Sequence, residues 1–395
     1  MIQGQAGRDE DVERFSLVRD DVFYRIQRKI GLIPPDGGGF LRRAVLYAMV
    51  AWLPLVIVAW WAGTAIDPLG GAEPLLGHIG IHVRCLVAIP LLVIAEGVAQ
   101  QNIPKGVREF KRSGLVSGEL SARFDQVLTD MLRLRNQVFP WILIAGLVVS
   151  WTAVLFMSPN LDEMRWANTE SPTLRFGVWW LLFVTRPIFS ILLLAWVWRL
   201  VLLGILLFRI ARLPLNLVVL HPDRVGGLGF LSRIPVVYAP IILSVSAVMA
   251  GVWAHEVLYH GVTVPSLYGQ IAALLGVLVL MGVAPLLVFS PLLMRAKRQA
   301  LLDYGVLLAQ HGRAVDDRWI RKMDVPDYPM LNAPELGPVA DIQALYQSVA
   351  SMRVAIITKS VLIKILLPAA LPLLILISLQ WPLKSTLTKL LFTLL

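Results

Sequence analysis

Long apolar runs alternate with polar segments along this chain, and seven of the runs are long enough to cross a membrane. They cover residues 44–66, 79–98, 139–158, 176–203, 235–256, 266–294 and 360–381. A helix rises about 1.5 Å per residue, so about 20 apolar residues span the hydrocarbon core of a bilayer. The pattern therefore predicts an all-α fold, a polytopic membrane bundle of about seven transmembrane helices.

Basic residues are concentrated in alternate connecting segments. Lys and Arg number 27 in segments 1–43, 99–138, 204–234 and 295–353, but only four in the connecting segments on the opposite side. Basic loops of membrane proteins are retained in the cytoplasm. We therefore predict a multi-pass protein of the bacterial cytoplasmic (inner) membrane with a cytoplasmic N-terminus.

The larger cytoplasmic segments are predicted to contain helices of their own. Residues 118–137 place apolar side chains three and four apart, residues 296–312 continue the sixth apolar run, and Asp341 is a suitable N-cap for a helix leading toward the seventh. Apolar faces need cover, so extensions of spans three, six and seven are expected to form a small cytoplasmic helical layer. The predicted organisation is a cytoplasmic segment (1–43), a bundle (44–381) with cytoplasmic insertions (99–138 and 295–353), and a short external tail (382–395).

Composition narrows the class of protein further. Hydrophobic residues make up 57% of the chain and charged residues 16%, whereas soluble domains average roughly 45–50% and 25%. An ordinary soluble enzyme is thereby excluded. The single cysteine, Cys85, excludes an intrachain disulfide. His255 and His260 are five residues apart, which does not match a zinc-binding helix, whereas His78 and His82 are four apart. We expect ordinary interfacial histidines instead of an external metal or proton site, and no metal or cofactor is expected.

Charged side chains inside the apolar runs are the first candidates for function, because a charge in a bilayer is costly. Arg186 lies about ten residues into the fourth run, roughly 15 Å deep, and Pro187 follows it. Arg84 lies in the outer half of the second run. Glu96 and Arg199 lie at similar depths near the inner ends of their runs, and they could form a structural ion pair or act at the inner mouth of a pathway.

A polar loop before the fifth run reads His221-Pro222-Asp223-Arg224-Val225-Gly226-Gly227-Leu228-Gly229-Phe230. Its three glycines permit tight turns and close backbone approach. His221, Asp223 and Arg224 could hold a phosphate or take part in acid–base chemistry. The alternative is a structured turn in which the histidine and the aspartate cap backbone groups. Gly226, Gly227 and Gly229 are candidates for the same site.

Motifs spread over nearly the whole chain form a further pattern. They are Tyr24-Arg25-Ile26-Gln27-Arg28-Lys29-Ile30-Gly31-Leu32, the Arg84 to Glu96 span with Pro90, the His221 to Phe230 loop, and Asp341-Ile342-Gln343 followed by Ser351-Met352-Arg353. This pattern resembles a family of uncharacterised bacterial multi-pass membrane proteins. The resemblance implies a shared fold, and it assigns no activity and no catalytic residue.

Three functions are consistent with these observations. We expect an oligomeric channel or transporter for a small solute, an anion more readily than a cation, with Arg186 and Arg84 attracting it. One alternative is a scaffold that docks a protein through its cytoplasmic helices. Another is a membrane enzyme acting on a lipid or polyprenyl phosphate, with His221 and Asp223 as its acid–base pair. The expected partners are the bilayer, further copies of the chain and a cytoplasmic protein, but no nucleic acid.

Overall fold

The structure is a computed structural model that describes residues 15–34, 38–66, 74–157, 166, 172–323 and 337–379. Within these ranges the regular structure is helical, without a β-strand. The predicted external tail over 382–395 lies outside the described residues, as does the first part of the N-terminal segment.

Seven helical stretches are long and apolar enough to cross a membrane, at the places that the hydropathy pattern predicts. They are α3 (Phe40–Trp61), α4 with α5 (Ile79–Val83 and Ile89–Arg112), α7 (Phe139–Met157), α8 with α9 (Pro172–Trp180 and Arg186–Ala211), α10 (Pro235–Tyr259), α11 (Tyr268–Leu287) and α14 (Lys359–Ser378). Short 3-10 helices lie at η1 (Leu75–Gly77), η5 (Gly229–Arg233) and η6 (Val264–Leu267). The all-α membrane bundle is thereby confirmed.

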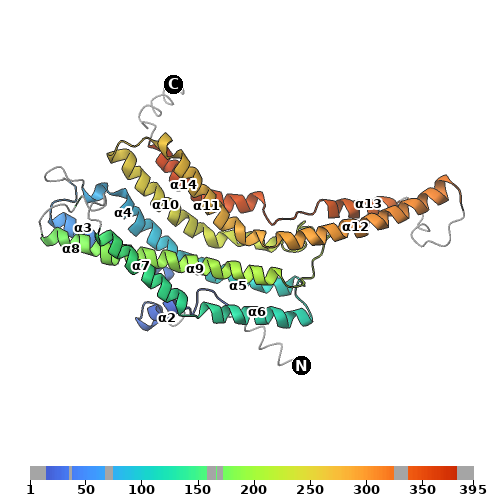
Figure 1. The fold of residues 1–395 in the computed structure, drawn as a ribbon, viewed down its shortest axis with the longest axis horizontal. Coiled ribbons are helices and arrows are strands. Elements are labelled where there is room, and N and C mark those ends of the chain that lie inside the picture. Colours follow the sequence, from blue (N-terminus) through green and yellow to red (C-terminus); the bar gives the residue numbers. More distant parts are fainter. Residues whose placement is uncertain are drawn as a thin grey trace, which may run out of the picture.

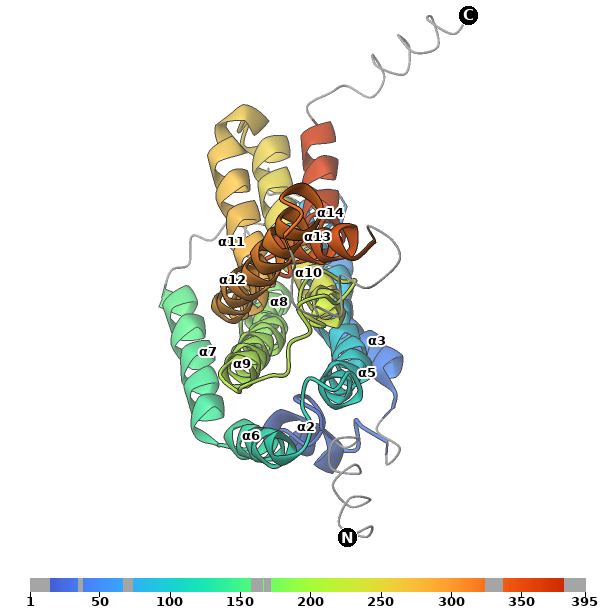
Figure 2. The ribbon, with the colours of Figure 1, turned by 90° about the vertical axis from the view of Figure 1, so that its right-hand side faces the viewer.

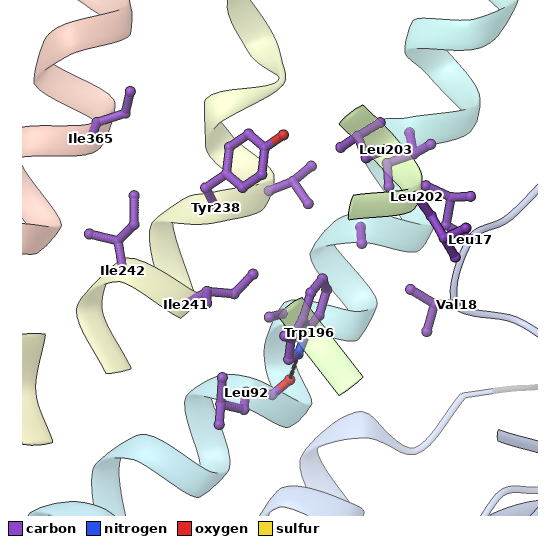
Figure 3. Close-up of a cluster of buried hydrophobic side chains, with 14 of the residues drawn as sticks. Leu17, Val18, Leu92, Trp196, Leu202, Leu203, Tyr238, Ile241, Ile242 and Ile365 are labelled. Atoms are coloured by element: carbon purple, nitrogen blue, oxygen red, sulfur yellow. Dashed lines mark hydrogen bonds between the residues drawn. The ribbon is translucent and has the colours of Figure 1, made fainter. Parts of the chain in front are cut away.

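The spanning helices form two groups that meet along α10 (Figures 1 and 2). Helix α10 packs against α14 and α11 in one group and against α4 and α5 in the other, while α5 also packs against α3 and α9. In the core between them, Tyr238 and Ile242 of α10 lie between Ile365 of α14 and Trp196 of α9 (Figure 3). Trp196 Nε1 donates to the Leu92 carbonyl at 2.7 Å, which satisfies the indole nitrogen inside this apolar core.

Two neighbouring spans each contain a π-helical bulge in their N-terminal half. The bulges are η2 (Arg84–Ala88), between α4 and α5, and η4 (Leu181–Thr185), between α8 and α9. In each, the N–H after the bulge bonds to the carbonyl five residues earlier. Pro90 and Pro187 lie two residues after the last residue of each bulge, and they have no N–H to continue the ordinary helical ladder. The sequence therefore interrupts the regular α-helix of both spans at similar places.

The amphipathic helix predicted over residues 118–137 is α6 (Glu119–Arg135). Its apolar side chains Phe124, Leu128 and Met131 are buried, and the helix packs along α9. Residues 136–138 interrupt the helix, so α6 turns relative to α7 instead of extending it in a straight line (Figure 2). The third span thus has the predicted helical extension, but a bent one.

The sixth span continues as α12 (Ser290–Val315), which ends in the π-helical turn η7 (Asp316–Ile320). Helix α13 (Gly337–Ala350) packs along α12, and the two form a hairpin that projects from the bundle (Figure 1). A non-helical segment over 351–358 separates α13 from α14, so the extension of span seven is also a separate helix. Helix α6 and the hairpin lie on opposite sides of the inner ends of α5 and α9 (Figures 1 and 2). The predicted cytoplasmic layer is therefore divided into two parts.

Candidate functional site

A buried network of charged side chains joins the N-terminal segment to three spans. Glu96 of α5 lies between two arginines: Arg199 Nη1 of α9 donates to Glu96 Oε1 at 2.8 Å, and Arg43 Nη2 of α3 lies 2.8 Å from Oε2. Asp21 and Gln27 complete the network, and all five side chains are no more than 2% exposed. Two carboxylates and two guanidinium groups balance, which is the condition for burying charge at tolerable free energy.

Asp21 has two roles in this network. Its Oδ1 accepts the Tyr24 N–H at 2.6 Å and so caps helix α2 (Val22–Lys29). Its Oδ2 accepts from Arg199 Nη2 at 2.8 Å and from Nε at 3.1 Å. One carboxylate therefore starts a helix and holds it against a spanning segment 178 residues further along the chain.

Aromatic rings and an amide orient both arginines. Arg43 donates to Gln27 Oε1 at 2.6 Å and lies over the Phe40 ring at 5.1 Å, while Arg199 lies over the Trp196 ring at 5.2 Å. The Arg43–Glu96 contact is an ion pair by distance, but its atoms are not aligned as a hydrogen bond. The arrangement is that of a rigid structural cluster near the inner ends of the spans.

The ion pair between Glu96 and Arg199, one of the two roles that the sequence suggested for these residues, is present in the structure. Sequence reasoning did not identify Asp21 and Arg43, because a charged residue is ordinary in a polar segment or at the first turn of a span. The N-cap position of Asp21, directly before an amphipathic helix, is the signal that could have identified it. Since Glu96 and Arg199 each have close partners in this network, their ion pairing explains why they are buried.

Arg84 and Arg186 lie at the two π-bulges. Arg84 begins η2, is 8% exposed, and places its guanidinium over the Phe189 ring of α9 at 5.8 Å. Arg186 follows η4 and precedes Phe189 by three residues, so both are on the same helical face. Arg84 of the second span therefore contacts the part of the fourth span that directly follows Arg186.

The glycine-rich loop is a compact turn built around Asp223. Its Oδ1 accepts the N–H groups of Val225 at 2.8 Å and Gly227 at 3.2 Å, and its Oδ2 accepts that of Gly229 at 2.8 Å. His221 Nδ1 lies 2.9 Å from Oδ1. Burial alone would raise the pKa of Asp223, but the three N–H groups and His221 outweigh it, so this pKa lies below its ordinary value.

Backbone conformation explains the glycines of the turn. Gly226 and Gly227 have φ of 68° and 92°, in the left-handed region that favours glycine. A Cβ on Gly229 would lie 2.9 Å from the Asp223 carboxylate, so a side chain there would displace the capping group. The structured-turn interpretation of this loop accounts for Asp223 and the three glycines.

The segment before the last span rests on this turn. Arg353 donates its N–H to the Arg224 carbonyl at 2.7 Å and its Nη2 to the Asp223 carbonyl at 3.0 Å. Lys364 of α14 donates to the Ser232 carbonyl at 3.0 Å. The loop therefore joins α9, α10 and α14 at the inner end of the bundle. Its carboxylate is already the acceptor of three backbone donors, which makes it a poor general base.

Histidines gather at the opposite end of the bundle. His78 and His255 stack with ring centroids 4.7 Å apart, and His260 meets His255 edge-on at 5.5 Å. Over the described part of the chain, no group of three histidine, cysteine or acidic side chains is placed to hold a metal ion.

Comparisons with known proteins do not extend this description. No protein-family model matches the chain, and no curated protein or solved structure matches it either. The resemblance to bacterial multi-pass membrane proteins therefore stays a prediction. The geometry and the seven apolar helices define the class: an integral membrane protein of the multi-pass helical type.

Proposed function

We propose that this membrane protein conducts or carries a small anion, and that Arg84 and Arg186 attract it within the bilayer. The observation that carries the proposal is the placement of one buried or half-buried arginine at each of two π-bulges on facing spans. π-Bulges recur at functional sites, and interrupted helices line many transporter sites.

Arg84 and Arg186 belong to spanning helices, so their charges lie in a low-dielectric region. Charged side chains inside spans commonly mark substrate or ion pathways. The Phe189 ring orients the Arg84 guanidinium, and Arg186 precedes Phe189 on the same helix by three residues. Guanidinium groups recognise anions, so a small anion is the solute that this pair favours.

Flux through reconstituted liposomes tests the proposal. Chloride and potassium flux under a set potential is measured for the wild type, Arg84→Gln and Arg186→Gln. A charge-assisted hydrogen bond is worth about 1.5–3 kcal/mol, so each variant should lose about tenfold or more of the chloride flux. Arg212→Gln is the matched control, since Arg212 also lies over a phenylalanine on α9, but at its exposed end.

Two results would overturn this assignment. One is chloride flux in both arginine variants equal to that of the wild type, with the variants shown to be folded by their elution and thermal unfolding. The other is an equal loss in Arg212→Gln, which would show that the charge matters but its position does not.

A second candidate, a scaffold, is favoured by the projecting α12–α13 hairpin. Leu302 and Val306 lie one turn apart on α12 and are 66% and 55% exposed, outside the packed bundle. A protein that co-purifies with the wild type from native membranes, but not with Leu302→Gln/Val306→Gln, would support docking on this face. Identical co-purification with both would count against it.

A further inference from the structure

A hollow of about 550 Å³ lies just beyond the inner end of the second span, between the last turns of α5 and the start of α10. Small-molecule sites commonly measure roughly 300–1,000 Å³. The hollow is separate from the Asp223 turn and from the arginines at the π-bulges, none of which line it.

The rim of the hollow is strongly basic. Lys105, Arg108 and Arg112 line it from α5, and Arg233 lines it from the end of η5. The three α5 residues are spaced by three and four, so they follow one face of the helix. Glu109 is the one carboxylate in the lining. It lies 4.0 Å from Arg112, whose side chain is 83% exposed, so this pairing is weak and the hollow keeps a net positive charge.

Part of the lining of the hollow is apolar. It is formed by Phe230 of η5, Val237 in the first turn of α10, and Ile234 between these two helices. The Phe230 ring is held edge-on against Phe110 at 5.0 Å. The hollow therefore offers both cations and apolar side chains, which suit the charged headgroup and the apolar chains of a lipid.

Gly106 lies in the middle of this lining. A Cβ added at this glycine would meet no atom within 4 Å, so the space over α5 at this point is open. The glycine is therefore not required for helix packing. Its absent side chain leaves room for a ligand beside Lys105.

We propose that this hollow binds the phosphate group of an anionic ligand, with Lys105 of α5 and Arg233 of η5 as its main contacts. Basic pockets between spanning helices on the cytoplasmic side suit the phosphates of lipid headgroups. Arginine recognises phosphate through paired N–H donors, and lysine adds a point charge. The same chemistry would accept a lipid phosphate or a free phosphate. The proposal does not depend on the anion pathway.

Native mass spectrometry of the whole protein in detergent measures the binding, with phosphatidylglycerol and inorganic phosphate titrated separately. The pocket variants are Lys105→Gln/Arg233→Gln and Gly106→Leu, the second of which fills the hollow without changing its charge. Arg123→Gln/Arg298→Gln is the control, because both residues are exposed cations on α6 and α12, away from the hollow. Each cation removed from the hollow should weaken binding roughly fivefold.

Phosphatidylglycerol binding that falls in both pocket variants and survives in the control supports a lipid phosphate. Binding of inorganic phosphate with the same pattern supports a free phosphate. Gly106→Leu keeps the test valid if the double variant fails to fold, because leucine is a better helix former than glycine. Equal loss in pocket and control variants, or binding of neither phosphatidylglycerol nor inorganic phosphate by the wild type, overturns the proposal.

Discussion

Glu96 is the carboxylate that links Arg43 to Arg199, and its loss would leave two guanidinium groups opposed by Asp21 alone. Removing one partner from a buried ion cluster typically costs about 3–5 kcal/mol, because the remaining charges stay buried. We therefore expect Glu96→Gln to lower the free energy of unfolding by that amount, measured by thermal or denaturant unfolding in detergent. Glu119→Gln, at the start of α6, should have little effect.

A second substitution in the same network sharpens this test. Arg43→Met added to Glu96→Gln restores the balance of charge, leaving the Asp21–Arg199 pair intact. The double variant should be more stable than Glu96→Gln, since neighbouring residues in one network do not contribute additively. A double variant less stable than either single variant would show that shape, and not charge balance, governs the cluster.

Asp223 provides a pH-dependent contribution to stability. Because its pKa is lowered in the folded protein, it stabilises the fold above its unfolded pKa of about 3.9, and this stabilisation is lost as pH falls through the lower folded value. Asp223→Asn should be less stable than the wild type by about 1–3 kcal/mol near neutral pH. The difference should be constant above about pH 5 and shrink below about pH 4. A difference that grows on acidification would contradict this assignment.

Close helix packing depends on small residues, and the contact between α11 and α14 is an example. A Cβ on Gly282 would lie 2.6 Å from Ile365 Cδ1, whereas a Cβ on Gly276 of the same helix would meet nothing within 4 Å. We expect Gly282→Leu to destabilise the protein by about 1–3 kcal/mol through overpacking, and Gly276→Leu to be nearly neutral. Unfolding temperatures of the two variants in the same detergent check this, and equal values would refute it.

The amphipathic pattern predicted the cytoplasmic helices but not their arrangement. The spacing of Phe124, Leu128 and Met131 is sufficient to place α6 as a helix with one apolar face. Its bend from α7 follows from the interruption at residues 136–138 together with packing along α9. An amphipathic pattern does not specify which neighbouring helix covers the apolar face. The division of the predicted helical layer into α6 and the α12–α13 hairpin could therefore not be predicted from the sequence.

The orientation of the whole molecule in the membrane is testable with single cysteines. Native Cys85 is fully buried, so a membrane-impermeant maleimide should not label it. Ser266→Cys, in the exposed turn before α11, should be labelled in intact cells. Arg298→Cys, on α12, should be labelled only after permeabilisation. The reverse pattern would show that the charge distribution misassigns the cytoplasmic side.

Membrane class, the seven spans and the expected sidedness are readable from the chain alone, because transfer of a 20-residue segment into a bilayer depends mainly on that segment's own composition. Which side chains pair with one another cannot be predicted from the composition of single segments. Asp21, Arg43, Glu96 and Arg199 come from four separate helical elements, and hydropathy does not specify how each helix is rotated about its axis. Tertiary packing therefore decided which charges meet, that Asp223 caps its own loop, and that four cations surround one hollow.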